Sequence, residues 1–182
     1  MKVFCGYGDA GAVTTANPEV VELLGRYRYL GTVDKEVCVT PELNHKIDSL
    51  LAALLVVNME FLPKWINIRR KHAAHYHSRL GSLFRCPNLP INKNDKKNVF
   101  YDYTIIASDR DNLMQHLVSR GIEVKIKHPI LMPDQPAYSH LTTTDIPLAR
   151  EHVEHILTLP IHEKLTADDI DFVCDAVLGF RE

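Results

Sequence analysis

The start of the chain holds a lysine and a glycine-rich turn at a spacing that could serve catalysis or cofactor binding. Lys2 precedes Gly6–Gly11 (GYGDAG), which fits the pattern G-x-G-x-x-G. In a dinucleotide-binding fold, the third glycine opens a helix whose N-terminus holds a pyrophosphate. Here β-branched residues and then Pro18 follow, so we expect a tight turn that leads into a strand at Ala12–Thr15. A nicotinamide-nucleotide protein built on this turn is the less favoured alternative.

The 10 histidines raise the question of a metal site. His72 and His75 are spaced i, i+3, as are His152 and His155, with Glu154 inside the second pair. A helical zinc protease instead spaces its histidines i, i+4 and places glutamate directly after the first. We therefore expect these histidines on charged helical faces, and no metal site.

The composition is that of an ordinary globular protein. Of the 182 residues, 46% are apolar and 24% are charged, and the net charge of −2 gives no basic face for nucleic acid. The four cysteines form no C-x-x-C pair, which fits a reducing cytoplasm rather than a zinc ribbon or disulfide scaffold. The N-terminus lacks the apolar stretch of a signal peptide. The longest apolar run, Leu50–Val57, is too short to span a bilayer, so we expect a cytoplasmic protein.

Two helical zones are expected in the first half of the chain. Asn17-Pro18-Glu19 has the residue types of a helix N-terminus, and that helix should end at Gly31. Asp48–Leu80 is strongly helical, with an apolar stripe broad enough to be covered on more than one side. Pro63 within it predicts two helices or one kinked helix. We expect the Arg69–Lys71 cluster on a solvated face.

The remainder of the chain alternates between strand and helix patterns, which predicts a small α/β layer structure. A polar stretch at 92–97 should be a loop. The expected elements after it are a strand at 99–107, a helix from a capping-box-like start at 108–111 to Arg120, a strand at 123–127, a helix at 145–157, an extended segment at 159–162 and a last helix capped at Thr166–Asp169.

The segment Lys2–Thr15 (KVFCGYGDAGAVTT) resembles the lysine loop of the DegT/StrS family of nucleotide-sugar aminotransferases, which depend on pyridoxal phosphate (PLP). In that family a lysine precedes a Gly-Asp/Glu-Gly/Ala-Gly turn and a strand that ends in Val-Thr. Four later passages resemble family motifs in the family's order, and together the five cover essentially the whole chain but only the family's C-terminal half. They are NPE…LL…RYLG (17–31), NHKID…AAL (44–54), GIEV…HP…QPAY (121–138) and LPIH…LT (159–166).

The resemblance implies an α/β fold, that of the fold-type-I PLP-dependent transferases. It implies a remnant of the large PLP-binding domain at 1–47, a helical connector at 48–81 and the small C-terminal α/β domain at 82–182. The implied reaction moves an amino group from glutamate or glutamine to a nucleotide-linked keto-sugar, in cell-surface polysaccharide or antibiotic sugar biosynthesis. The alternative is a truncated relic, or a subunit of a split aminotransferase, that acts as a non-catalytic interaction module.

The resemblance also assigns the cofactor site. Lys2 is implied to form the Schiff base with PLP and to shuttle the substrate proton, chemistry open to lysine but not to arginine or histidine. A lysine here argues against the family's dehydratases, which carry histidine at this position. Asn44 is implied to reach the cofactor phosphate of a neighbouring subunit, although it could instead cap a helix that begins near Lys46.

Three residues are implied to bind substrate. His128 matches the histidine of the family's His-Tyr-Pro motif, although it could be only a loop histidine before a proline. Lys46 stands where the family usually has arginine, and Tyr101 where a histidine is common, so the substrate contacts differ from the family pattern. The expected partners are a nucleotide-sugar, an amino-acid donor and either a second copy of the chain or a complementary polypeptide that carries the N-terminal half. Neither nucleic acid nor a membrane is expected as a partner.

Overall fold

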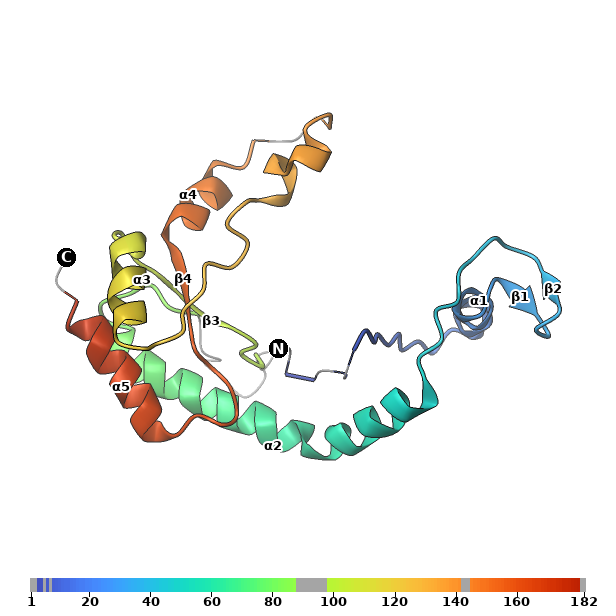
Figure 1. Ribbon diagram of the computed structural model, residues 1–182, viewed down its shortest axis with the longest axis horizontal. Coiled ribbons are helices and arrows are strands. Elements are labelled where there is room, and N and C mark those ends of the chain that lie inside the picture. Colours follow the sequence, from blue (N-terminus) through green and yellow to red (C-terminus); the bar gives the residue numbers. More distant parts are fainter. Residues whose placement is uncertain (1–2, 5, 7, 88–97, 142–144, 181–182) are drawn as a thin grey trace. The chain divides into compact units, whose positions relative to one another are not determined.

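The computed structural model describes residues 3–4, 6, 8–87, 98–141 and 145–180 (Figure 1). The chain divides into two compact units, Met1–Leu62 and Pro63–Glu182, and each is described by itself. The boundary falls within the segment expected as a connector. The three-part division inferred from the sequence stays a prediction.

The first unit begins with an extended segment that leads into helix α1 (Pro18–Arg28). The Asn17 side chain accepts a hydrogen bond from the backbone N–H of Glu19 at 2.9 Å, and Pro18 is the first helical residue, so the predicted helix start is confirmed. Strand β1 (Thr32–Val33) and strand β2 (Val37–Cys38) then form an antiparallel hairpin. The strand expected at Ala12–Thr15 is absent, because no neighbouring strand pairs with this segment in the described part of the chain.

Helix α2 (Ser49–Leu80) is one continuous helix that passes through the unit boundary with Pro63 inside it. By length and composition alone it could cross a membrane, because an 18-residue window has a mean hydropathy of 1.4 and none of that window is buried. The sequence-based expectation weighed only the shorter run Leu50–Val57. A part of this helix therefore presents an apolar surface that nothing in its own unit covers.

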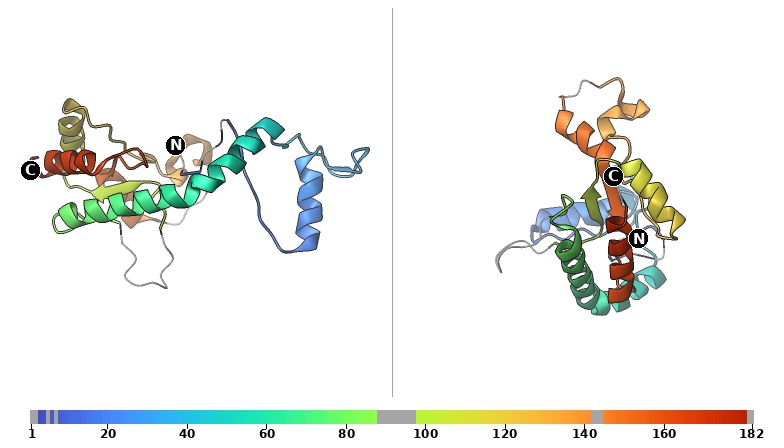
Figure 2. Two further views of the ribbon diagram at one scale, coloured as in Figure 1. Left: turned by 90° about the horizontal axis from the view of Figure 1, so that it is seen from below. Right: turned by 90° about the vertical axis from the view of Figure 1, so that its left-hand side faces the viewer.

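The second unit is built on strand β3 (Tyr103–Ile106) and strand β4 (Ile156–Leu159), which pair antiparallel with Tyr103 opposite Leu159. Helix α3 (Arg110–Ser119), helix α5 (Ala167–Leu178) and the C-terminal part of α2 pack around this pair. Figures 1 and 2 show α5 beside that part of α2, where Arg79 bridges to Asp171 and Asp175. The strand expected at 123–127 is reduced to a single bridge between Lys125 and Thr158.

An arm outside the core lies between the buried segment of Ile122 and Val124 and strand β4. It contains two short 3₁₀ helices, η1 (Met132–Asp134) and η2 (Pro136–Tyr138), and helix α4 (Pro147–His155), and none of these three elements buries a residue. The hydrophobic core of the described residues belongs wholly to the second unit. It includes Tyr76, Leu80, Tyr103, Ile105, Leu113, Leu117, Leu157, Leu159, Ile170 and Val177.

Candidate functional site

The glycine turn at the start of the chain lies against α2. A Cβ atom added at Gly6 would meet Leu55 at 3.9 Å, and one added at Gly8 would meet Leu51 at the same distance. Gly8 has a φ of +141°, a conformation that favours glycine. No helix follows before Pro18, so the dinucleotide-fold alternative is wrong. Lys2 itself lies outside the described residues.

A cavity of about 1290 Å³ opens in the first unit between the extended segment 9–15 and α1. Its lining includes two residues expected at the site, Asn44 and Lys46, together with Arg28, Thr14 and Thr15. These side chains offer an amide, two cations and two hydroxyls, the donor types that bind phosphate oxygens. The residues present therefore fit the phosphate of PLP or of a nucleotide.

Asn44 and Lys46 are held by contacts within their own segment. The Asn44 side-chain oxygen accepts from the backbone N–H of Lys46 at 3.2 Å, and the Asn44 backbone bridges to Tyr29. The Lys46 ammonium lies 4.2 Å from the centre of the Tyr29 ring. Because α2 begins at Ser49, Asn44 does not cap a helix near Lys46. Among the described hydrogen bonds of the Asn44 side chain only the oxygen is used, so the side-chain nitrogen can donate to a ligand.

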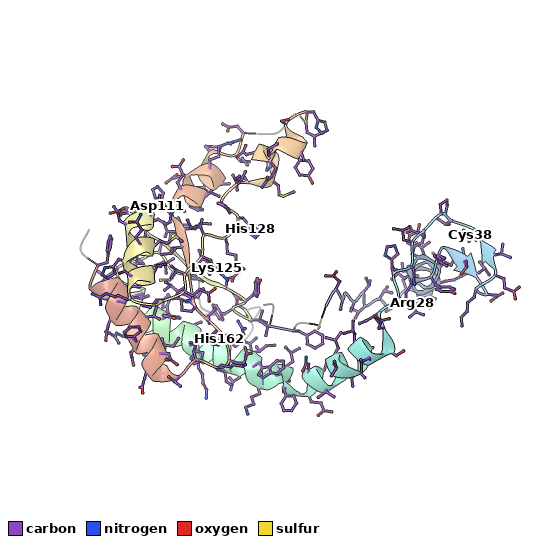
Figure 3. All side chains as sticks on the ribbon, in the orientation of Figure 1. Arg28, Cys38, Asp111, Lys125, His128 and His162 are labelled. Carbon is purple, nitrogen blue, oxygen red and sulfur yellow. The ribbon has the colours of Figure 1, made fainter. Side chains whose placement is uncertain are left out.

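The other two expected substrate residues belong to the second unit, where their segments meet. The Lys127 ammonium donates to the Tyr101 hydroxyl at 3.2 Å, lies 4.4 Å from the centre of that ring and pairs with Asp102 at 3.1 Å. Hydrogen bonds to Tyr101 and then to Asp102 raise the pKa of Lys127, so it stays protonated. His128 follows directly, exposed and with a φ of +52° (Figure 3). Sequence reasoning missed Lys127, whose partners are known only from the fold.

The expectation of a solvated face at Arg69–Lys71 is wrong for Arg69, which is 3% exposed. Its guanidinium donates to the carbonyl of Ile161 at 2.8 Å and to that of Tyr101 at 3.4 Å, and it pairs with Glu163 at 3.1 Å. It therefore ties the turn that carries Tyr101 to the segment after β4. Helical periodicity in the sequence could have identified Arg69 as buried, because the buried residues of α2 share one face. They are Arg69, His72, Ala73, Tyr76 and Leu80.

The electrostatics around Arg69 favour an ionised Glu163. Burial alone would raise the pKa of this carboxyl, but its own backbone N–H and the Arg69 charge outweigh burial and lower it. The contact joins α2 to the segment after β4 within the second unit. It serves to hold the backbone beside Tyr101 in place.

Known proteins match almost the whole chain. The DegT/DnrJ/EryC1/StrS aminotransferase family model matches residues 1–178. The chain is 32% identical to a dTDP-3-amino-3,4,6-trideoxy-alpha-D-glucose transaminase of Streptomyces venezuelae, over 97% of this chain and 47% of that protein. It is 28% identical to a dTDP-3-amino-3,6-dideoxy-alpha-D-galactopyranose transaminase of Aneurinibacillus thermoaerophilus, over 92% of this chain and 46% of that protein.

A crystal structure of a DegT DnrJ EryC1 StrS aminotransferase from Brucella abortus is similar in fold, with a TM-score of 0.91 and 26% identity. That similarity covers 97% of this chain and 48% of the other. The chain thus spans about half the length of the relatives it matches. The α/β fold is that of the PLP-dependent sugar aminotransferases. This chain belongs to the DegT/DnrJ/EryC1/StrS aminotransferase family.

Proposed function

We propose that this chain is the C-terminal half of the catalytic unit of a PLP-dependent aminotransferase that acts on nucleotide-linked keto-sugars in the cytoplasm. The observation that carries the proposal is the family match over residues 1–178, which includes the Lys2 segment and the residues around the cavity. Relatives that match more than nine-tenths of this chain are named as transaminases or aminotransferases of dTDP- and UDP-linked sugars. Glutamate or glutamine would be the amino donor.

When bound, PLP supplies an electron sink that stabilises negative charge at the substrate carbon. Lys2 would attach the cofactor through its Nζ and, once displaced, take and return the substrate proton at that atom. Asn44 would donate its amide N–H to the cofactor phosphate of a neighbouring subunit. Lys46, Tyr101 and His128 would bind and orient the substrate, with Lys127 fixing the Tyr101 hydroxyl.

A second function from another class has its own supporting observation. The first unit contributes no residue to the hydrophobic core of the described residues. This observation supports the alternative that the chain acts as a non-catalytic interaction module of a split or reduced enzyme. In both cases we propose that it acts with another polypeptide, either a second copy or a chain that supplies the other half of the family fold.

Borohydride trapping separates the two functions. The chain would be mixed with PLP and the part of the Streptomyces venezuelae transaminase that it does not match, then reduced, digested and mapped by mass. We expect a pyridoxyl group on Lys2, which disappears in Lys2→Ala and persists in the control Lys164→Ala. A label on another lysine, or on none, would contradict the aminotransferase proposal and leave the interaction module.

A further inference from the structure

A second, smaller cavity of about 450 Å³ lies within the first unit, and we name it the hairpin cavity. Its volume is in the range of small-molecule sites. Residues from the end of α1, the β1–β2 hairpin and the segment before α2 line it, and they include Arg28, Tyr29, Thr32, Asp34, Lys35 and Lys46. Thr32, Asp34 and Lys35 do not line the cavity of about 1290 Å³, so the hairpin cavity has a wall of its own.

The charges around the hairpin cavity favour an anion. Three cations against one carboxylate leave a surplus of two positive charges in its lining. Within the described part of the chain, no hydrogen bond or ion pair involves the side chain of Arg28, Lys35 or Asp34 (Figure 3). The Lys46 ammonium lies over the Tyr29 ring, a contact that leaves its charge intact. The C-terminus of α1 opposes an anion with only about half a unit of negative charge.

Lys35 occupies a backbone position where glycine would be less strained. The Glu36 N–H donates to the Val33 carbonyl at 3.1 Å and closes a tight turn, in which Asp34 and Lys35 have φ of +52° and +63°. Positive φ at both central residues defines the type I′ hairpin turn, which favours aspartate and then glycine. Aspartate suits the first position, but lysine is strained at the second. Strained residues cluster at functional sites, and this one lines the hairpin cavity.

We propose that the hairpin cavity is a binding site for a phosphorylated ligand, with Arg28 and Lys35 as its phosphate-binding side chains. A phosphate monoester carries about 1.5–2 negative charges at pH 7, which matches the surplus. A guanidinium can donate to two phosphate oxygens at once, and an ammonium adds a point charge. Because Arg28 and Lys46 line both cavities, Lys35 is the cation that distinguishes this site from the larger cavity. The site goes beyond the proposed function, since it involves neither Lys2 nor PLP.

Titration of the full 182-residue chain with inorganic pyrophosphate, followed through backbone amide chemical shifts, tests the site. We expect saturable shifts at Thr32 and Lys35. Lys35→Gly removes the charge and relieves the strained backbone, so the affinity should fall about tenfold while Val37 keeps its native shift. Lys164→Gly removes an exposed lysine of the second unit and should leave the affinity unchanged.

The same titration with inorganic phosphate and with dTDP distinguishes the sources of the phosphate group. Tighter binding of dTDP than of either inorganic ion would assign the site to a nucleotide. Equal or weaker binding of dTDP would assign it to the free anion. Both results support a phosphate site in the hairpin cavity, provided that Lys35→Gly weakens the binding.

Three results would overturn the site. The first is the absence of saturable shifts at ~1 mM pyrophosphate. The second is an unchanged affinity in Lys35→Gly, or an equal loss in Lys164→Gly, which would attribute binding to overall charge. The third is a set of shifts confined to Thr14 and Thr15, which line only the larger cavity. Because the titration requires no cofactor, a failure to label Lys2 with PLP would contradict the proposed function and leave this site standing.

Discussion

His72 is a buried imidazole on the packed face of α2, 9% exposed. Burial, together with the nearby charges of His162, His75 and Arg69, lowers its pKa below 6.5 against a weaker opposing hydrogen bond at the backbone of Leu165. The folded state therefore holds His72 neutral, while the unfolded chain takes up a proton near pH 6.5. Its contribution to stability is present above that pH and is lost as the pH falls toward the folded-state pKa.

We expect the free energy of unfolding to fall between pH 7.5 and 5.5 by at most about 1.4 kcal/mol per pH unit for this one proton. His72→Leu should flatten that slope, whereas His140→Leu at an exposed histidine should not. Urea titrations at several pH values would measure the slope of the free energy of unfolding against pH. An unchanged slope in His72→Leu would assign the pH dependence to other groups.

Arg69 gives a second prediction at this scale. Arg69→Ala removes the donor to several carbonyls and leaves Glu163 without its partner, so we expect it to cost about 2–4 kcal/mol of stability. Arg69→Lys should recover only part of this loss, because an ammonium cannot span the same acceptors. Lys71→Ala, at an exposed neighbour, should cost less than about 0.5 kcal/mol. Denaturant unfolding of the three variants checks this order, and equal losses would contradict it.

Among the elements, the β1–β2 hairpin depends on one glycine. Gly31 has a φ of +63°, and a Cβ atom there would lie 1.7 Å from the carbonyl oxygen of Thr40. We expect Gly31→Ala to disrupt the hairpin, seen as loss of the native amide chemical shifts of Val33 and Val37. The control Gly25→Ala lies in α1 with nothing within 4 Å of an added Cβ, and it should stabilise that helix by about 0.5–1 kcal/mol. Native hairpin shifts in Gly31→Ala would contradict this.

Elements fixed by neighbouring residues were predictable from the sequence. Asn17 and Pro18 set the start of α1, and the Thr166 and Asp169 capping box sets the start of α5. The helix expected from 108–111 begins at Arg110 with Asp109 as its N-cap, and the Asp109 side chain accepts from the side chain of Asn112 instead of a backbone N–H.

Features that depend on distant parts of the chain were not predictable in the same way. The strand at Ala12–Thr15 is absent because it needs a partner strand, which the pattern alone cannot supply. At the site, Asn44 and Lys46 line one cavity of the first unit. Lys127 and Arg69 contact residues that are about 25–94 positions away in sequence, and no local pattern encodes such contacts.

At the scale of the whole molecule, the second unit holds the core and the first unit holds the lysine turn, the phosphate-suited cavity and the uncovered part of α2. The family match over residues 1–178 therefore includes a unit that contributes none of the described core residues. Asn44 and Lys46 lie in the first unit, and none of the described residues of that unit belongs to the hydrophobic core that would hold them in place.

The measurement that tests the central claim most directly is a PLP titration of the purified 182-residue chain, alone and with the unmatched half of the Streptomyces venezuelae transaminase. Absorbance in the visible range reports covalent attachment of the cofactor. We predict a saturable band with micromolar affinity only in the mixture, and its loss in Lys2→Ala. A saturable band and amination of a keto-sugar by the chain alone would contradict the account, because the chain would then be a self-sufficient enzyme.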